Sequence, residues 1–231
     1  MQLAQEELRV LRCTLFSACM LWALSGTAQA GGSLLVDDAA VTPAGHCQLE
    51  SWVRAYSHGQ ELTAVPACNR AGTEYSLGVS EFLSPRSGPL ATLGAKHLWR
   101  EVGQDKFGVG ATLSATWNAS DQHADLWSVN VPASIALNDQ QRRLVHVNLG
   151  WLDSGTSGRG LTAGLGVELP LNARSLLLAE IFAEPDHFRV GELGWRHVLT
   201  DAASVDFLIG HQGGLANSSW FTAIGINILF P

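Results

Sequence analysis

Apolar and polar residues alternate along most of the chain from His46 onward, in segments of about ten residues. The clearest segment runs from Lys106 to Trp117, where one set of alternate positions is apolar and the other holds only Lys, Gly, Ser or Thr. Successive side chains of a β-strand point to opposite faces, so one face of this strand suits lipid and the other suits water. The pattern is typical of the strands of a transmembrane β-barrel.

The same alternation recurs often enough to predict about twelve strands. We expect them at residues 46–57, 61–69, 73–83, 89–101, 106–117, 125–137, 143–153, 160–169, 174–183, 188–198, 203–211 and 219–230. Segments 61–69 and 188–198 alternate poorly, so a barrel of about ten strands is the alternative. The predicted fold is therefore all-β: a transmembrane antiparallel up-and-down β-barrel.

Alternate connections in this prediction share a turn chemistry. Asn or Asp occurs near residues 68–70, 137–139, 171–173 and 199–201. These residues tolerate unusual backbone angles and bond their own main chain, so they suit tight turns. Tight turns lie on the periplasmic rim of such barrels, and the connections between them, such as 153–158 and 213–217, then lie on the outer rim.

Aromatic residues fit this topology. Trp117, Trp127, Trp151 and Trp220 fall toward the outer rim, and Trp99, Trp195, Phe107 and Phe230 fall toward the periplasmic rim. Two aromatic girdles at the two interfaces are what amphipathic rings favour in a bilayer. Trp52 lies mid-strand among the polar positions and does not fit a girdle.

The N-terminus has the layout of a secretory signal peptide. Arg9 and Arg12 precede an apolar run, which ends before the small-residue junction at residues 28–30. We therefore assign residues 1–30 to a signal peptide, 31–45 to a periplasmic N-terminal segment and 46–231 to the outer-membrane β-barrel. An uncleaved membrane anchor is the alternative.

Composition supports a lipid environment. Charged residues form only 15% of the chain, which contains 24 Gly and 8 Trp. The expected mature part has no uninterrupted apolar run of about eighteen residues, so a closed barrel is the remaining route across a bilayer. We expect the outer membrane of a Gram-negative bacterium, with lipid as a partner. The net charge of −7 argues against a nucleic-acid partner.

Two cysteines, Cys47 and Cys68, remain after the expected cleavage. One lies near the start of the first predicted strand and the other near the end of the second, so the hairpin brings them opposite each other. In an oxidising compartment this predicts a structural cross-strand disulfide.

Three short motifs resemble a known family. Residues 34–39 and 43–50, at the start of the expected mature chain, and residues 68–75 resemble sequence motifs of a bacterial family. Its members are outer-membrane barrels labelled as phenol-degradation meta-pathway proteins. The resemblance implies an outer-membrane channel or transporter, often for hydrophobic compounds. This chain departs from the usual aromatic C-terminus because Pro231 follows Phe230.

The inward-facing positions carry charges of both signs. They are Glu50, Arg54, Glu74, Lys96, Lys106, His146, Glu168, Arg174, Glu180, Glu192, Arg196 and Asp206. Such charges either pair across strands and close the lumen, or line a water-filled path and set its charge selectivity. The sequence therefore predicts a channel or transporter for small solutes, hydrophobic ones included, with a lumen-sealed binding or scaffolding barrel as the alternative.

Histidines suggest a third, less favoured hypothesis. An outer-membrane acyl hydrolase would use His123, His187 or His211 near the outer rim, but the chain has no G-x-S-x-G elbow. His97, His146 and His197 lie on separate predicted strands without metal-ligand spacing. We therefore expect no enzyme activity, catalytic residue, metal or cofactor.

Overall fold

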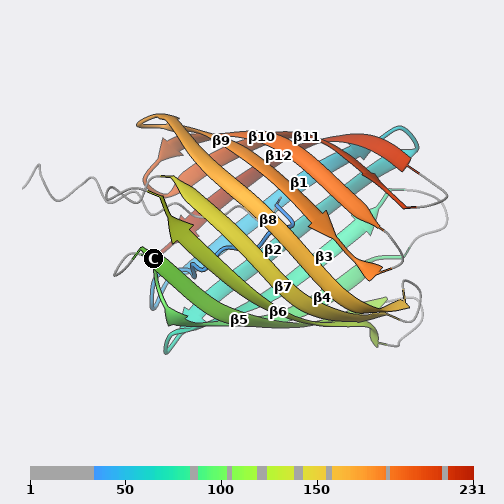
Figure 1. Ribbon diagram of the computed structural model, residues 1–231, viewed down its shortest axis with the longest axis horizontal. Coiled ribbons are helices and arrows are strands. Elements are labelled where there is room, and N and C mark those ends of the chain that lie inside the picture. The colour runs from blue at the N-terminus through green and yellow to red at the C-terminus, as the bar shows by residue number, and fades with distance from the viewer. Residues whose placement is uncertain are drawn as a thin grey trace, which may run out of the picture.

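The computed structural model describes residues 34–83, 88–102, 106–118, 124–137, 143–154, 158–185, 188–214 and 218–231. These form one closed barrel of twelve strands (Figure 1). In chain order the strands are β1 (Cys47–Tyr56), β2 (Gly59–Arg70), β3 (Thr73–Phe82), β4 (Leu90–Arg100), β5 (Phe107–Asn118), β6 (Ala124–Ala136), β7 (Leu144–Ser154), β8 (Gly158–Asn172), β9 (Ser175–Ala183), β10 (Arg189–Thr200), β11 (Ala203–Gly213) and β12 (Ser218–Phe230).

Every strand pairs antiparallel with its neighbours in sequence, and β1 pairs with β12 to close the sheet. The prediction of twelve strands is confirmed, and the alternative of ten is wrong. The two poorly alternating segments form β2 and β10 because leaving either out would expose strand edges with unpaired backbone groups. The expected signal peptide, residues 1–30, lies outside the described residues.

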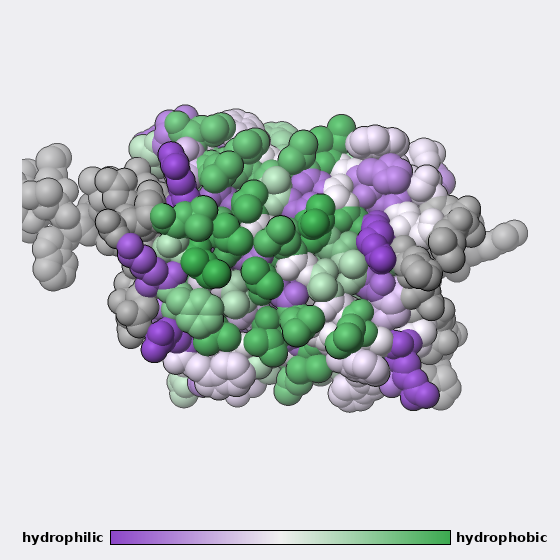
Figure 2. All heavy atoms as spheres, in the orientation of Figure 1, coloured by the Kyte–Doolittle hydropathy of each residue, from purple (hydrophilic) through white to green (hydrophobic). Residues whose placement is uncertain are grey.

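The outer face of the barrel is apolar. Figure 2 shows a broad hydrophobic band with hydrophilic residues at both ends. Outward side chains such as Leu113, Leu149 and Ile224 are each 59% exposed, whereas the side chains between them along the strands point inward and are more buried. An exposed apolar surface of this extent is the surface that hydrocarbon covers in a membrane barrel.

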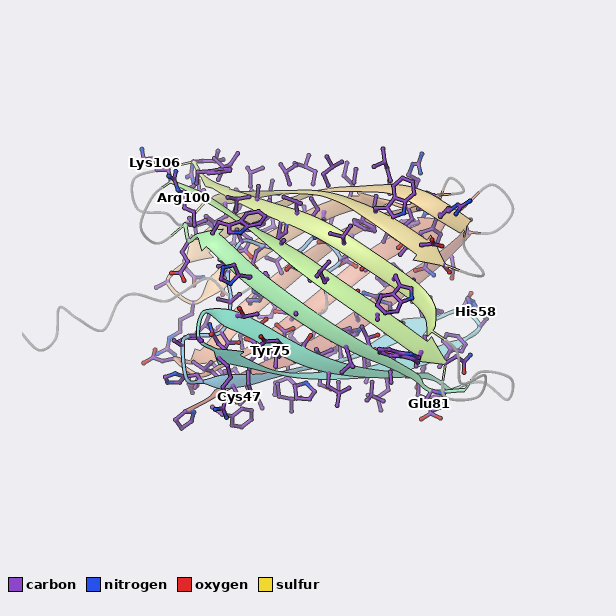
Figure 3. The ribbon with its side chains drawn as sticks, turned by 90° about the horizontal axis from the view of Figure 1, so that it is seen from below. Cys47, His58, Tyr75, Glu81, Arg100 and Lys106 are labelled. Carbon is purple, nitrogen blue, oxygen red and sulfur yellow. A yellow bond between two sulfur atoms is a disulfide. The ribbon has the colours of Figure 1, made fainter. Side chains whose placement is uncertain are left out.

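The two rims can be told apart by the chain ends of the barrel. We call the rim where β1 begins and β12 ends the terminal rim, and the opposite one the far rim. Figure 3 shows Cys47, Arg100 and Lys106 at the terminal rim, with His58 and Glu81 at the far rim. By strand position, the two predicted groups of aromatic residues lie near these two rims, and Trp117 meets Trp127 with ring centroids 6.4 Å apart. Trp52 has the same parity as the inward Arg54.

At the terminal rim, β2 and β3 are joined by Ala71 and Gly72 alone, both with positive φ, 53° and 82°. Left-handed conformations at both central residues define the hairpin turn whose twist matches the flanking strands. The connections β8–β9 and β10–β11 are equally short. The connection at 137–143 is longer than the tight turn expected at 137–139.

A disulfide closes the first hairpin at the same rim. Cys47 and Cys68 are directly paired in the β1–β2 register, with Cα atoms 4.0 Å apart. The pairing is the one that the sequence predicts. Among the described residues, no helix is long and apolar enough to cross a membrane.

Candidate functional site

The lumen holds the chain's own N-terminal segment. We call residues 34–42 the lumen segment; it enters the barrel from the terminal rim, just before β1. Val36, Ala39 and Thr42 are 1%, 2% and 1% exposed. Residues 34–42 of the expected periplasmic N-terminal segment at 31–45 therefore lie inside the barrel, where inward side chains bond their backbone.

The backbone of the lumen segment bonds to barrel side chains in place of strand partners. Five amides donate: Leu35 N and Val36 N to Glu180 (2.7 and 3.0 Å), Asp37 N to Asn148 Oδ1 (2.8 Å), Ala39 N to Ser134 Oγ (2.7 Å) and Thr42 N to Glu74 (2.7 Å). Two carbonyls accept, from Asn148 Nδ2 to Asp37 O and from Asn69 Nδ2 to Thr42 O, both at 2.6 Å. Buried backbone groups without such partners would be costly, so these side chains determine where the segment lies.

Charge holds the middle of the segment. Lys96 Nζ of β4 lies 2.6 Å from Asp37 Oδ1 and 3.0 Å from Asp38 Oδ1. Thr112 donates to the second oxygen of Asp37 at 2.8 Å. A buried lysine needs a charged partner, and here the partners come from the segment rather than from the barrel wall.

Inward glycines make room for the segment. A Cβ added at Gly164 would come within 2.9 Å of a Val36 methyl group, and one at Gly166 within 3.2 Å. A Cβ at Gly108 would come within 3.1 Å of Ala39 Cβ. The wall beside β8 and β5 therefore lacks side chains where the segment packs.

Ion pairs between strands cross other parts of the lumen. Arg196 donates to both oxygens of Asp206 at 2.7 and 2.8 Å, across the β10–β11 pair. His146 Nε2 lies 3.7 Å from Glu168 Oε1. Arg54 Nη2 lies 3.9 Å from Glu192 Oε2. These contacts are of the kind expected under the first of the two alternatives for mixed inward charges, pairing across strands.

Toward the far rim the interior is aromatic. Phe221 of β12 is 2% exposed and lies 5.8 Å from the ring of Tyr56, centroid to centroid. The Arg54 guanidinium carbon stands 4.8 Å from the Phe221 ring centroid, a favourable cation–π position. Beyond the strands, burial raises the pKa of Glu184, which follows β9.

A cavity of about 220 Å³ remains beside the lumen segment. The segment forms one wall, and β1 to β5 form the other, with Glu50, Glu74 and Lys96 among the lining residues. Its volume equals that of several water molecules. The lumen therefore keeps free space next to the segment.

Ten of the twelve predicted lumen residues face inward. Arg54, Glu74, Lys96, His146, Glu168, Glu180, Glu192, Arg196 and Asp206 are buried, and Glu50 lines the cavity. Lys106 and Arg174 are exposed rather than inside the barrel: Lys106 precedes β5, and Arg174 lies in the β8–β9 turn. Both positions lie at a rim, outside the alternation of the strands.

The prediction missed some of the residues that hold the segment in place. Asp37 and Asp38 lie before the first strand, where no alternation marks them. Ser134 and Asn148 share the inward parity of the charged positions, so this parity could have identified them. Their uncharged side chains gave no further signal.

Two histidines contact serine hydroxyls: His146 Nδ1 lies 2.8 Å from Ser134 Oγ, and His197 Nδ1 lies 3.1 Å from Ser175 Oγ. His211 is exposed near the far rim, with its ring centroid 5.1 Å from that of Trp220. His123 and His187 lie outside the described residues. No group of three or more His, Cys, Asp or Glu side chains that could hold a metal ion occurs among the described residues.

Comparison with known proteins gives a family and a fold. A family model described as "Uncharacterised conserved protein UCP029691" matches residues 18–230. No curated protein matches the chain. The resemblance to phenol-degradation meta-pathway proteins is thus not confirmed by the matching family.

Solved structures share the barrel at low identity. The KdgM porin has a TM-score of 0.64 at 9% identity, over 78% of this chain and 98% of its own. The NanC porin has a TM-score of 0.60 at 10% identity, over 79% and 98%. The COG4313 outer membrane channel from Pseudomonas putida F1 has a TM-score of 0.56 at 11% identity, over 85% and 100%. The fold is that of outer-membrane porins and channels, and none of these three structures is described as an enzyme.

Proposed function

The chain belongs to the family described as uncharacterised conserved protein UCP029691, and we propose that it is an outer-membrane channel for small solutes whose path the lumen segment closes. The observation that carries the proposal is the way the segment is held. Side chains of seven strands bind it through hydrogen bonds and one lysine, and within the described residues no strand pairs with it. Polar contacts of this kind can exchange for water, so the segment can leave without breaking the barrel.

The surface supports the proposed location. The apolar band faces outward around a closed sheet, which needs no water to satisfy its backbone. Short turns and both barrel termini share the terminal rim, which we assign to the periplasmic side. The lumen segment then enters from the periplasm.

The interior supports passage of solutes once the segment has left. The segment fills the space beside Gly164 and Gly166, and this space becomes free when the segment leaves. The exposed wall is then polar and charged on several strands, as expected of a water-filled path. An apolar patch formed by Leu178, Leu208 and Ala223 offers a place for hydrophobic parts of a solute.

A lumen-sealed barrel is the second candidate. The bidentate Arg196–Asp206 pair favours it, because strand-to-strand pairs stay in place whether or not the segment leaves. In that case the protein would act as a binding or scaffolding barrel, with the lumen segment as a permanent part of its core.

Single-channel recording separates the two. The protein purified from outer membranes is compared with a variant whose residues 34–42 are replaced by a Gly/Ser stretch of the same length. The channel proposal expects rare openings of the natural protein and a sustained current for the variant. A variant that keeps the barrel fold by circular dichroism but carries no current contradicts the channel.

A further inference from the structure

Two acidic side chains face each other on the lumen wall, with one arginine, Arg54, beside them. Glu180 of β9 and Glu192 of β10 are directly paired in the register, and both are buried. Like charges directly opposite on one face of a sheet are destabilising. Arg54 Nη2 lies 3.9 Å from Glu192 Oε2, beyond hydrogen-bonding distance.

The lumen segment supplies hydrogen-bond donors to Glu180. Leu35 N donates to one carboxylate oxygen and Val36 N to the other. One carboxylate thus takes two N–H donors from one short stretch of chain. Among the described residues, no N–H group donates to either oxygen of Glu192, although its side chain is 0% exposed.

An apolar wall continues from this pair. Leu178 lies two residues before Glu180 on the same face of β9, and it forms a cluster with Leu208 and Ala223. Leu34 of the segment packs against that cluster. Residues 34–36 therefore place an apolar side chain on the patch and N–H donors on the carboxylates.

We propose that Glu180, Glu192 and the neighbouring Leu178 patch form a binding site for an organic cation, an ammonium group carrying an apolar substituent, and that residues 34–36 occupy this site in the closed channel. The inference rests on the proposed function, since the segment must leave before such a solute can enter. The ammonium takes the place of the two backbone amides and extends to Glu192. The substituent takes the place of the Leu34 side chain.

The chemistry excludes other classes of ligand from this site. An anion would meet two buried carboxylates, which costs several kcal/mol without a counter-charge. A bare divalent ion prefers six or more oxygen ligands, which one pair of carboxylates beside an apolar patch does not offer. An alkylammonium ion matches both parts of the wall.

The test uses the variant with residues 34–42 replaced by a Gly/Ser stretch, and butylammonium chloride as the probe. We expect cation selectivity in a KCl gradient and a K⁺ current that butylammonium reduces. Replacing both acids, Glu180→Gln with Glu192→Gln, should raise the half-blocking concentration by about tenfold or more, as expected on losing a charge-assisted hydrogen bond. Glu168→Gln, a buried acid of the lumen wall beside His146, is the matched control and should leave the block unchanged.

The outcomes are distinguishable. A current that butylammonium does not reduce, or that it reduces equally in the double variant, overturns the binding site and leaves the channel standing. A variant without current contradicts the channel itself. Calorimetric titration of that same protein with butylammonium, against sodium butyrate as a control, then decides the binding site alone. If the double variant does not fold, Glu192→Gln alone gives the comparison.

Discussion

Lys96 and Asp37 join the barrel wall to the lumen segment through an ion pair of 2.6 Å between Nζ and Oδ1. Lys96 also bonds Asp38, so one lysine neutralises much of the charge of two segment carboxylates. The pair is formed between parts of the chain that are 59 residues apart. It links the position of the segment to a single side chain of β4.

Removing that lysine should release the segment. Lys96→Met leaves two carboxylates in the lumen without their cation, and breaking a buried ion pair in this way costs about 3–5 kcal/mol. We expect more frequent channel openings and faster proteolysis of residues 34–42 in membranes. Lys106→Met, at the exposed rim position, is the control. Adding Asp37→Asn and Asp38→Asn to Lys96→Met should restore closure, because no unpaired charge then remains. A Lys96→Met protein that opens no more often than the natural protein would contradict the role of this pair.

The inward glycines that Val36 packs against give a steric prediction. Gly166→Val places methyl groups where Val36 packs, since even a Cβ there would lie 3.4 Å from Val36 Cβ. The segment should be displaced and the current increased. Val36→Gly added to Gly166→Val should restore closure by returning the space. Gly191→Val is the control, because a Cβ at Gly191 meets no atom closer than 3.8 Å; an equal effect of the control would exclude the steric explanation.

The disulfide should stabilise the barrel. Its cysteines are 21 residues apart. Closing a loop of that size removes entropy from the unfolded chain, which raises the free energy of that state by about 3 kcal/mol at room temperature. Cys47→Ser with Cys68→Ser should lower the free energy of unfolding in urea by roughly that amount. Reduction of the natural protein should give the same loss. Unchanged unfolding midpoints in both cases would show that the strands alone fix the hairpin.

The turn at Ala71 offers a stabilising substitution. Ala71 has a φ of 53°, a conformation in which a Cβ costs about 1–2 kcal/mol. Asn tolerates this conformation and is preferred before Gly in such turns. Ala71→Asn should therefore raise the free energy of unfolding by about 1 kcal/mol. Ala202→Asn, in the β10–β11 turn, should give no comparable gain, and equal effects of the two would contradict the turn argument.

The sequence predicts the barrel well for a physical reason. Lipid outside and polar groups inside force the period of two, so strands such as β5 and β7 can be read directly from alternation. The same alternation along the strands predicts that Glu180 and Glu192 lie on the inner face, where the two are directly paired. Closure of the sheet then required β2 and β10, where alternation is weak.

The position of the lumen segment could not be predicted in this way. Leu34, Leu35 and Val36 form a short apolar run with no strand period, and nothing in it marks the side chains that would bind its amides. The amide partners come from four strands, β3, β6, β7 and β9, which are distant from the segment in sequence. Only the closed barrel brings Glu74, Asn148 and Glu180 to one short peptide.

A reversible cross-link tests closure by the segment most directly. Val36→Cys and Gly166→Cys place two thiols on Cβ positions 3.4 Å apart, close to the separation in a disulfide. Cys47→Ser and Cys68→Ser in the same protein make this bond the target of the reductant. Recorded in a planar bilayer, the oxidised protein should carry no current, and channel openings should begin when reductant is added. Equal currents before and after reduction would contradict closure of the channel by the lumen segment.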